Sequence, residues 1–291
     1  MIPVTYRCYW TQPEEEARKE TFKELADAGI TRITLSDGAI RDFIQNPDFM
    51  FRMKKELKEY GLQVMDAHAP WGTWRDPGMP LEEYHDAVVN YQKLALFVAQ
   101  ELGVTTMAYH TGNTLPGTFG PLPFEAYEKM LIRSLEELLP LAEKYDFIMA
   151  LENQWTPLNS SRSLMKILKH FNSPNLGFCY DSGHAHLTEC GSSDPEKSCV
   201  PALWKAMDME VEWEEDWIGM FKDHVVCSHL HSNEGFADSH ILPEKDDGMP
   251  WKHIMDVFAE APRLQCVQFE VNQSPAVQQE TARKLFPCLE S

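Results

Sequence analysis

Residues 81–110 read LEEYHDAVVNYQKLALFVAQELGVTTMAYH and contain one complete repeat of the pattern that decides the fold. The first part places apolar residues three and four positions apart over several turns, which predicts an amphipathic helix. Gly103 then offers the left-handed conformation that commonly ends a helix, and the apolar run at 104–110 predicts a strand. The predicted strand ends in His110.

The same order of helix, short turn and strand recurs along the chain. Gly29 and Gly61 precede strands as Gly103 does. A doubly wound sheet usually carries a phosphate-binding glycine motif after its first strand, and that motif is missing here. Eight such units in 291 residues therefore predict an α/β fold, a single (β/α)₈ TIM barrel that spans residues 1–291 as one domain. The predicted strands are 4–10, 30–36, 62–69, 104–110, 147–152, 176–181, 225–231 and 265–271.

The composition restricts the kind of partner. The chain has 26 Lys and Arg against 45 Asp and Glu, a formal net charge of −19, and its apolar share of 43% is ample for a core. Such an excess of negative charge repels phosphate backbones and anionic lipid headgroups, so we expect no nucleic-acid or membrane partner. No apolar run approaches the roughly 18 residues that a spanning helix needs, and no signal peptide is visible, which predicts a cytoplasmic protein.

Seven cysteines are scattered along the chain without a CxxC pair. An odd number of dispersed cysteines, several of them in apolar runs, is typical of free thiols rather than of a disulfide framework or a zinc knuckle.

Ionisable and imidazole side chains end the predicted strands from the third to the eighth. Any one of them alone is more often a satisfied polar residue than a ligand. Six consecutive strand ends of this kind are different, because each buried polar group raises the free energy of folding unless something compensates it. The active site of a TIM barrel lies at these ends, so we expect the side chains to converge. They are His68, His110, Glu152, Asp181 with His184, His229 with His231, then Asp238 and His240 in the following loop, and Glu270.

A divalent metal ion would compensate several of these groups at once. Carboxylate and imidazole ligands together suit Mn²⁺, Zn²⁺, Co²⁺ or Fe²⁺, and the lack of thiolate candidates at the strand ends argues against a structural zinc site. The sequence therefore predicts a metal centre on the barrel axis.

The strand-end series resembles the xylose isomerase-like superfamily of TIM barrels, which contains sugar phosphate isomerases and epimerases, inosose dehydratases and the endonuclease IV type of AP endonuclease (AP endonuclease family 2). The most specific part is 229–251, HLHSNEGFADSHILPEKDDGMPW, which is similar to the HLHDN...DxHLPPGxGxIDW segment of sugar isomerases and epimerases. Ser232 stands where that segment usually has Asp, and 244–247 replaces much of its Pro-Gly turn.

The resemblance implies a metal held by Glu152, Asp181, Glu270 and a histidine of the seventh strand. His229 and His231 both remain candidates, because residues two apart on a strand face the same side. The implied activity is isomerisation or epimerisation of a sugar, a ketose or polyol. The implied step is proton transfer next to the carbonyl of an open-chain ketose, through a metal-stabilised enediolate. One of the two glutamates would remove the proton and the other would return it.

The remaining strand-end residues are expected to bind the substrate, a small sugar or polyol. His184 would contact a substrate oxygen, and indole rings in the loops would cover the apolar face of a sugar. The expected substrate-binding residues are His68, His110, His184, Asp238, His240, Trp71 and Trp155, with Trp10 and Trp74 as further members of the pocket wall.

Other functions stay open. An endonuclease IV-like phosphodiesterase is the chief alternative, because the nine positions that bind three zinc ions in that branch have counterparts here. The loops 68–78, 110–120 and 152–162 are aromatic and nearly neutral, which disfavours DNA. A dehydratase of the inosose dehydratase type and a non-catalytic metabolite-binding barrel are further alternatives, and a homo-oligomer is compatible with the family.

Overall fold

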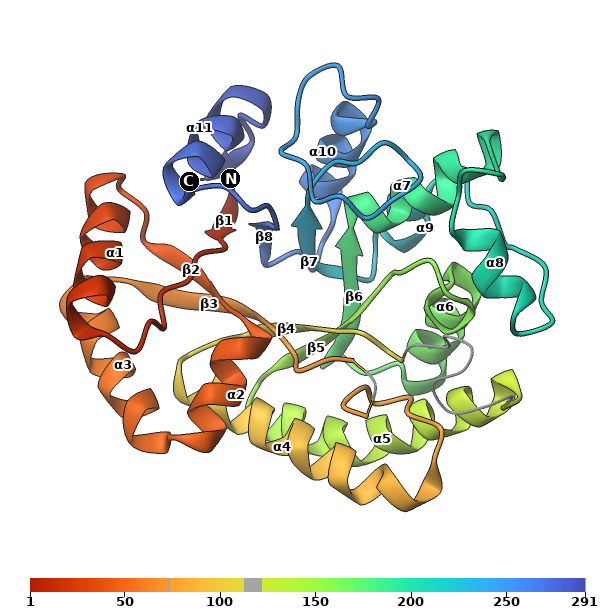
Figure 1. Ribbon diagram of the computed structural model, residues 1–291, viewed down its shortest axis with the longest axis horizontal. Coiled ribbons are helices and arrows are strands. Elements are labelled where there is room, and N and C mark those ends of the chain that lie inside the picture. Colours follow the sequence, from red (N-terminus) through yellow and green to blue (C-terminus); the bar gives the residue numbers. More distant parts are fainter. Residues whose placement is uncertain (73, 113–121, 291) are drawn as a thin grey trace.

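The computed structural model describes residues 1–72, 74–112 and 122–290, and these form a closed parallel barrel surrounded by helices (Figure 1). Each strand pairs with its neighbour in chain order, and β1 pairs with both β8 and β2, which closes the sheet. This arrangement confirms the predicted (β/α)₈ barrel. The barrel strands are β1 (Ile2–Tyr6), β2 (Arg32–Leu35), β3 (Gln63–His68), β4 (Thr106–Tyr109), β5 (Ile148–Glu152), β6 (Leu176–Asp181), β7 (Val225–Leu230) and β8 (Cys266–Phe269).

Helices cover the outside of the barrel (Figure 1). A short ninth strand, β9 (Leu289–Glu290), pairs with β1 next to the N-terminus. Gly29, Gly61 and Gly103 have positive φ values of 72°, 66° and 85°, as expected for residues that end helices before a strand. The helices are α1 (Glu15–Asp27), α2 (Asp37–Gln45), α3 (Pro47–Glu59), α4 (His85–Glu101), α5 (Phe124–Lys144), α6 (Ser161–Phe171), α7 (Ser182–Cys190), α8 (Val200–Lys205), α9 (Trp217–Phe221), α10 (Trp251–Glu260) and α11 (Pro275–Leu285).

Alternation along the strands separates the two sides of the sheet. Outward residues such as Leu151, Tyr180 and Phe269 pack with the helices in the main hydrophobic core. The inward positions immediately below the strand ends carry small side chains that form a separate buried layer, among them Cys179 and Cys227. Small residues at that level leave room above them for the larger polar side chains.

The first strand is shorter than predicted, because it ends at Tyr6 rather than at residue 10. Trp10 lies in the core: it is 1% exposed, its Nε1 donates to the carbonyl of Thr34 at 2.8 Å, and its ring packs against Phe43. The prediction that Trp10 forms part of the pocket wall is therefore wrong.

All seven cysteines are free thiols, as predicted. Across the described parts of the chain, no helix is long and apolar enough to cross a bilayer.

Candidate metal centre and active site

A cavity of about 380 Å³ opens at the carboxyl ends of the strands. This volume lies at the small end of the range for small-molecule sites, which is about 300–1,000 Å³. Its lining comes from β2, β3, β5, β8 and the loops that follow the strands, and it includes Glu152 and Glu270. Most of the polar strand ends predicted from the sequence therefore converge on one cavity.

Glu152 ends β5 and is 1% exposed. On one side, its Oε2 atom lies 3.4 Å from Nε2 of His68 and 3.4 Å from Nε2 of His110. The two imidazole nitrogens are 3.2 Å apart. Ligands at 2.0–2.1 Å from a tetrahedral zinc ion are about 3.3–3.4 Å from one another. These three atoms, which we call group 1, therefore already have the spacing of one face of a tetrahedral metal site.

The other oxygen of Glu152 belongs to a second set of atoms, group 2. Glu152 Oε1 lies 3.1 Å from Nδ1 of His229, and the same nitrogen is 2.9 Å from Oε2 of Glu270. Asp181 Oδ2 completes the set at 3.8 Å from this nitrogen. Ligand atoms from all four residues lie within 4.8 Å of one another. Glu152 thus joins groups 1 and 2 through its two carboxylate oxygens.

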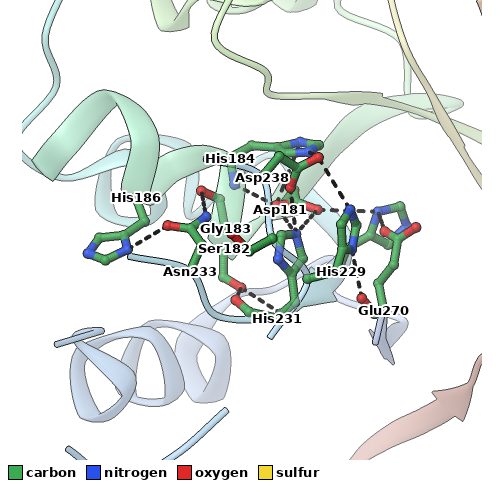
Figure 2. A network of polar contacts seen from close by, with 12 residues as sticks. Asp181, Ser182, Gly183, His184, His186, His229, His231, Asn233, Asp238 and Glu270 are labelled. Carbon is green, nitrogen blue, oxygen red and sulfur yellow. Dashed lines mark hydrogen bonds and ion pairs between the residues drawn. The ribbon is translucent and has the colours of Figure 1, made fainter. Parts of the chain in front are cut away.

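A third set, group 3, surrounds Asp238. Nε2 of His184 and Nε2 of His240 lie 3.5 and 3.3 Å from its Oδ2 atom, and Nε2 of His231 lies 3.8 Å from its Oδ1 atom. Figure 2 shows His184 and His231 beside Asp238. His231 also contacts Asp181, with 3.0 Å between Nε2 and Oδ1. His229 and His231 therefore face different groups, although they are only two residues apart.

The start of α7 places Asp181 of group 2 close to His184 of group 3 (Figure 2). Asp181 caps this helix, because its Oδ1 atom accepts a hydrogen bond from the backbone N–H of His184 at 2.7 Å. Ser182 Oγ donates to the carbonyl of His231 and accepts from its backbone N–H. Gly183 lies directly against the His231 ring.

The site combines buried acids with imidazoles. Burial alone would raise the pKa of Glu152, but His229 and His110 outweigh burial and hold this pKa well below its usual range. Burial alone would lower the pKa of His184, but Asp181 and Asp238 raise it to about 10. The acids of groups 2 and 3 therefore need positive charge beside them, from imidazole protons or from a cation.

The donor set fits a divalent cation. Glu152 Oε2 and His231 Nδ1 are buried polar atoms without a hydrogen-bond partner. Arg7 is the one Lys or Arg among the described residues that line the cavity, so the protein supplies little other positive charge there. A bound cation would satisfy the orphaned oxygen and neutralise the acids.

The other predicted residues divide between the cavity and the surface. Trp71 and Trp155 line the cavity, and the Trp155 ring contacts the His184 ring edge-on with 4.9 Å between centroids. Trp74 is 44% exposed, packs against Tyr91 and is not among the described residues that line the cavity. Residues 113–121, which include most of the nearly neutral loop 110–120, lie outside the described residues.

The sequence reasoning missed Arg7 and Gln154, which both line the cavity. Arg7 directly follows β1, and its Nη1 atom lies 2.9 Å from Oε1 of Glu270. Its position after a strand was the available signal, but the first strand was predicted to continue to residue 10.

Comparison with known proteins places this geometry in a family. Solved structures with the same fold include a D-tagatose 3-epimerase-like protein (18% identity, 99% of this chain and 98% of that chain, TM-score 0.70). Others are a 3-keto-D-glucoside 4-epimerase from E. coli (14% identity, 99% and 100%, TM-score 0.65) and a Thermus thermophilus protein soaked with zinc chloride (19% identity, 100% of both chains, TM-score 0.65).

No curated protein sequence matches the chain significantly. The model of one protein family matches residues 22–287, most of the chain, and its members are described as xylose isomerase-like TIM barrels. Together with the closed barrel and the acidic and imidazole strand ends, this match shows that the chain belongs to the xylose isomerase-like TIM barrel family.

Proposed function

We propose that the protein is a metal-dependent isomerase or epimerase of a ketose or polyol. The observation that carries the proposal is the pair of carboxylates in group 2. Oxygens of Glu152 and Glu270 lie 3.1 and 2.9 Å from the same His229 nitrogen, and both residues line one small cavity. Two carboxylates that face one substrate provide both an acceptor and a donor of a carbon-bound proton.

The proposed ligands are the members of group 2: Glu152, Asp181, His229 and Glu270. His229 is preferred to His231 because its Nδ1 atom faces both glutamates, whereas His231 contacts Asp181 and group 3. A divalent cation held there, Mn²⁺, Zn²⁺, Co²⁺ or Fe²⁺, would supply positive charge for the substrate oxygen on which negative charge develops.

The proton transfer is assigned to the two glutamates. His229 also holds the pKa of Glu270 well below its usual range, although burial alone would raise it, which favours the ionised form that accepts a proton. One accepts the proton from the carbon beside the carbonyl. The other first takes up a proton from solvent and then delivers it, while the first later returns its own proton to solvent. Delivery to the opposite face of that carbon gives an epimer, and delivery to the neighbouring carbon gives an isomer.

The rest of the cavity suits a sugar. Trp71 and Trp155 present indole rings that cover the apolar face of a pyranose or an open-chain sugar and exclude water. His68, His110, His184, Asp238 and His240 are the proposed contacts to its hydroxyl groups. Two of the structural neighbours are named as an epimerase or epimerase-like protein, which supports this reaction class.

Exchange of hydrogen with solvent tests the proposal directly. The metal-loaded protein is incubated with a panel of ketoses in deuterium oxide, and deuterium at the carbon beside the carbonyl is measured by NMR. We expect exchange with at least one ketose, and loss of at least 100-fold in Glu152→Gln and Glu270→Gln. Near-normal exchange in either variant would refute the two-glutamate scheme, and no exchange with any ketose would refute the proposed reaction class.

Phosphodiester hydrolysis of the endonuclease IV type is the second candidate function, because groups 1, 2 and 3 form three adjacent sets of possible ligands. Several metal ions at one site are typical of phosphodiester hydrolases. The net charge of −19 disfavours a DNA substrate. Cleavage of an oligonucleotide with an abasic site at physiological salt, lost on metal removal, would favour this candidate.

A further inference from the structure

Arg7 contacts a residue of group 2 but belongs to none of the three groups. Its Nη1 atom pairs with Oε1 of Glu270 at 2.9 Å, while Oε2 of the same carboxylate faces His229 at 2.9 Å. Glu270 therefore divides its two oxygens between a guanidinium and the proposed cation site. Within the described residues, no other side chain of the protein pairs with the Arg7 guanidinium.

The backbone holds Arg7 and Glu270 independently of each other. Gln278, which is fully buried in α11, donates from Nε2 to the carbonyl of Arg7 at 3.0 Å. The backbone N–H of Glu270 donates to the carbonyl of Leu230, and its carbonyl accepts from Nδ1 of His240 at 2.8 Å. Removal of the guanidinium would thus leave the Glu270 backbone in place and free only its carboxylate.

A free carboxylate next to a divalent cation has a second way to bind. Carboxylates coordinate cations through one oxygen or through both, and a nearby positive charge also repels a cation. Without the guanidinium, both oxygens of Glu270 could turn toward the cation site. In the structure, Oε1 instead contacts the Arg7 guanidinium while Oε2 contacts His229.

We propose that Arg7 is a positioning residue that reserves one oxygen of Glu270 for the proton transfer by keeping it off the cation. The part of this inference that concerns the proton rests on the proposed isomerase or epimerase function. The part that concerns the cation does not, because it follows from the charges and contacts of Arg7, Glu270 and His229 alone.

The test compares Arg7→Met, which keeps much of the side-chain length without charge, with Arg7→Lys, which keeps the charge. Affinity for Mn²⁺ and Zn²⁺ is measured by competition with a chromophoric chelator, and deuterium exchange is measured with the ketose that the wild-type protein turns over. We expect Arg7→Met to bind both cations at least 10-fold more tightly and to exchange at least 10-fold more slowly, mainly in kcat. Arg7→Lys should return both values to within about threefold of wild type.

Arg41→Met is the matched control, because Arg41 is a similarly exposed arginine in α2 that pairs with Asp42 at 3.4 Å, and it should change neither value. Unchanged or weaker cation binding by Arg7→Met would overturn the inference, since general damage to the fold weakens binding. If the wild-type protein exchanges no ketose, the proposed function fails, and cation affinity alone then decides the inference about Arg7.

Discussion

Replacement of Gly183 by alanine tests the close contact between the backbone of α7 and the His231 ring. Gly183 is the second residue of α7, and its backbone does not have a positive φ. A Cβ atom at this position would lie 2.0 Å from Cε1, 2.4 Å from Nδ1 and 2.7 Å from Nε2 of the His231 ring. The expected effect is therefore steric, and it acts on one identified side chain.

The size of the effect follows from these distances. Ordinary contacts of a Cβ atom begin at 3.4 Å, so the ring must retreat by about 1.4 Å from its present 2.0 Å. Such a shift breaks the 3.0 Å contact between His231 and Asp181. Overpacking costs about 1–3 kcal/mol and a lost hydrogen bond about 1 kcal/mol. At roughly 2–4 °C per kcal/mol for a chain of this size, Tm should fall by about 4–16 °C.

Differential scanning calorimetry of the metal-free and metal-loaded protein measures this change, and chelator competition measures cation affinity. Gly38→Ala is the matched control, because Gly38 is likewise the second residue of its helix, α2, and the nearest atom to its new Cβ would be 3.8 Å away. That variant should be neutral or more stable by up to about 1 kcal/mol. The reasoning is wrong if Gly183→Ala matches wild type in both Tm and cation affinity.

Two further outcomes are expected. Glu270 and Glu152 raise the pKa of His229 well above its usual range, although burial alone would lower it, so a cation that binds group 2 must displace the proton of this imidazole. Cation affinity should therefore rise from pH 6 to pH 9 with proton release, measurable by calorimetry in buffers of different ionisation enthalpy, and a pH-independent affinity would contradict this. Trp10→Phe leaves the carbonyl of Thr34 without its buried donor, so unfolding in urea should show a loss of about 1–3 kcal/mol while cation affinity stays unchanged. A weaker cation affinity in Trp10→Phe would instead indicate that Trp10 supports the site.

The barrel and the convergence of its strand ends were predictable, because both depend on local patterns. A helix that ends in glycine before an apolar strand is visible in residues 81–110, and parallel strands in a barrel bring their carboxyl ends to one face. Glu152 and Asp181 therefore lie together because each ends its own strand, and the end of each strand can be predicted from its local sequence.

The arrangement within the site depends on contacts between strands, which no local pattern records. The separation of His229 from His231 follows from the bond between Ser182 and the His231 backbone and from the space at Gly183. Trp10 was misplaced because a tryptophan after an apolar run looks the same whether its ring faces the cavity or the helices. Arg7 was missed for the related reason that the strand end was placed four residues too late.

What binds beside the two oxygens of Glu152 distinguishes the proposed isomerase or epimerase from the phosphodiester hydrolase. Glu152 Oε2 is buried, and its nearest donors are the imidazole nitrogens of His68 and His110 at 3.4 Å, which do not form good hydrogen bonds, so a further group bound beside them would stabilise it. In an isomerase that carries one cation in group 2, this partner is a hydroxyl group of the substrate. In a hydrolase it is a second cation, present before any substrate arrives. The metal content of the substrate-free protein therefore separates the two: one equivalent per chain supports the isomerase, and two or three support the hydrolase.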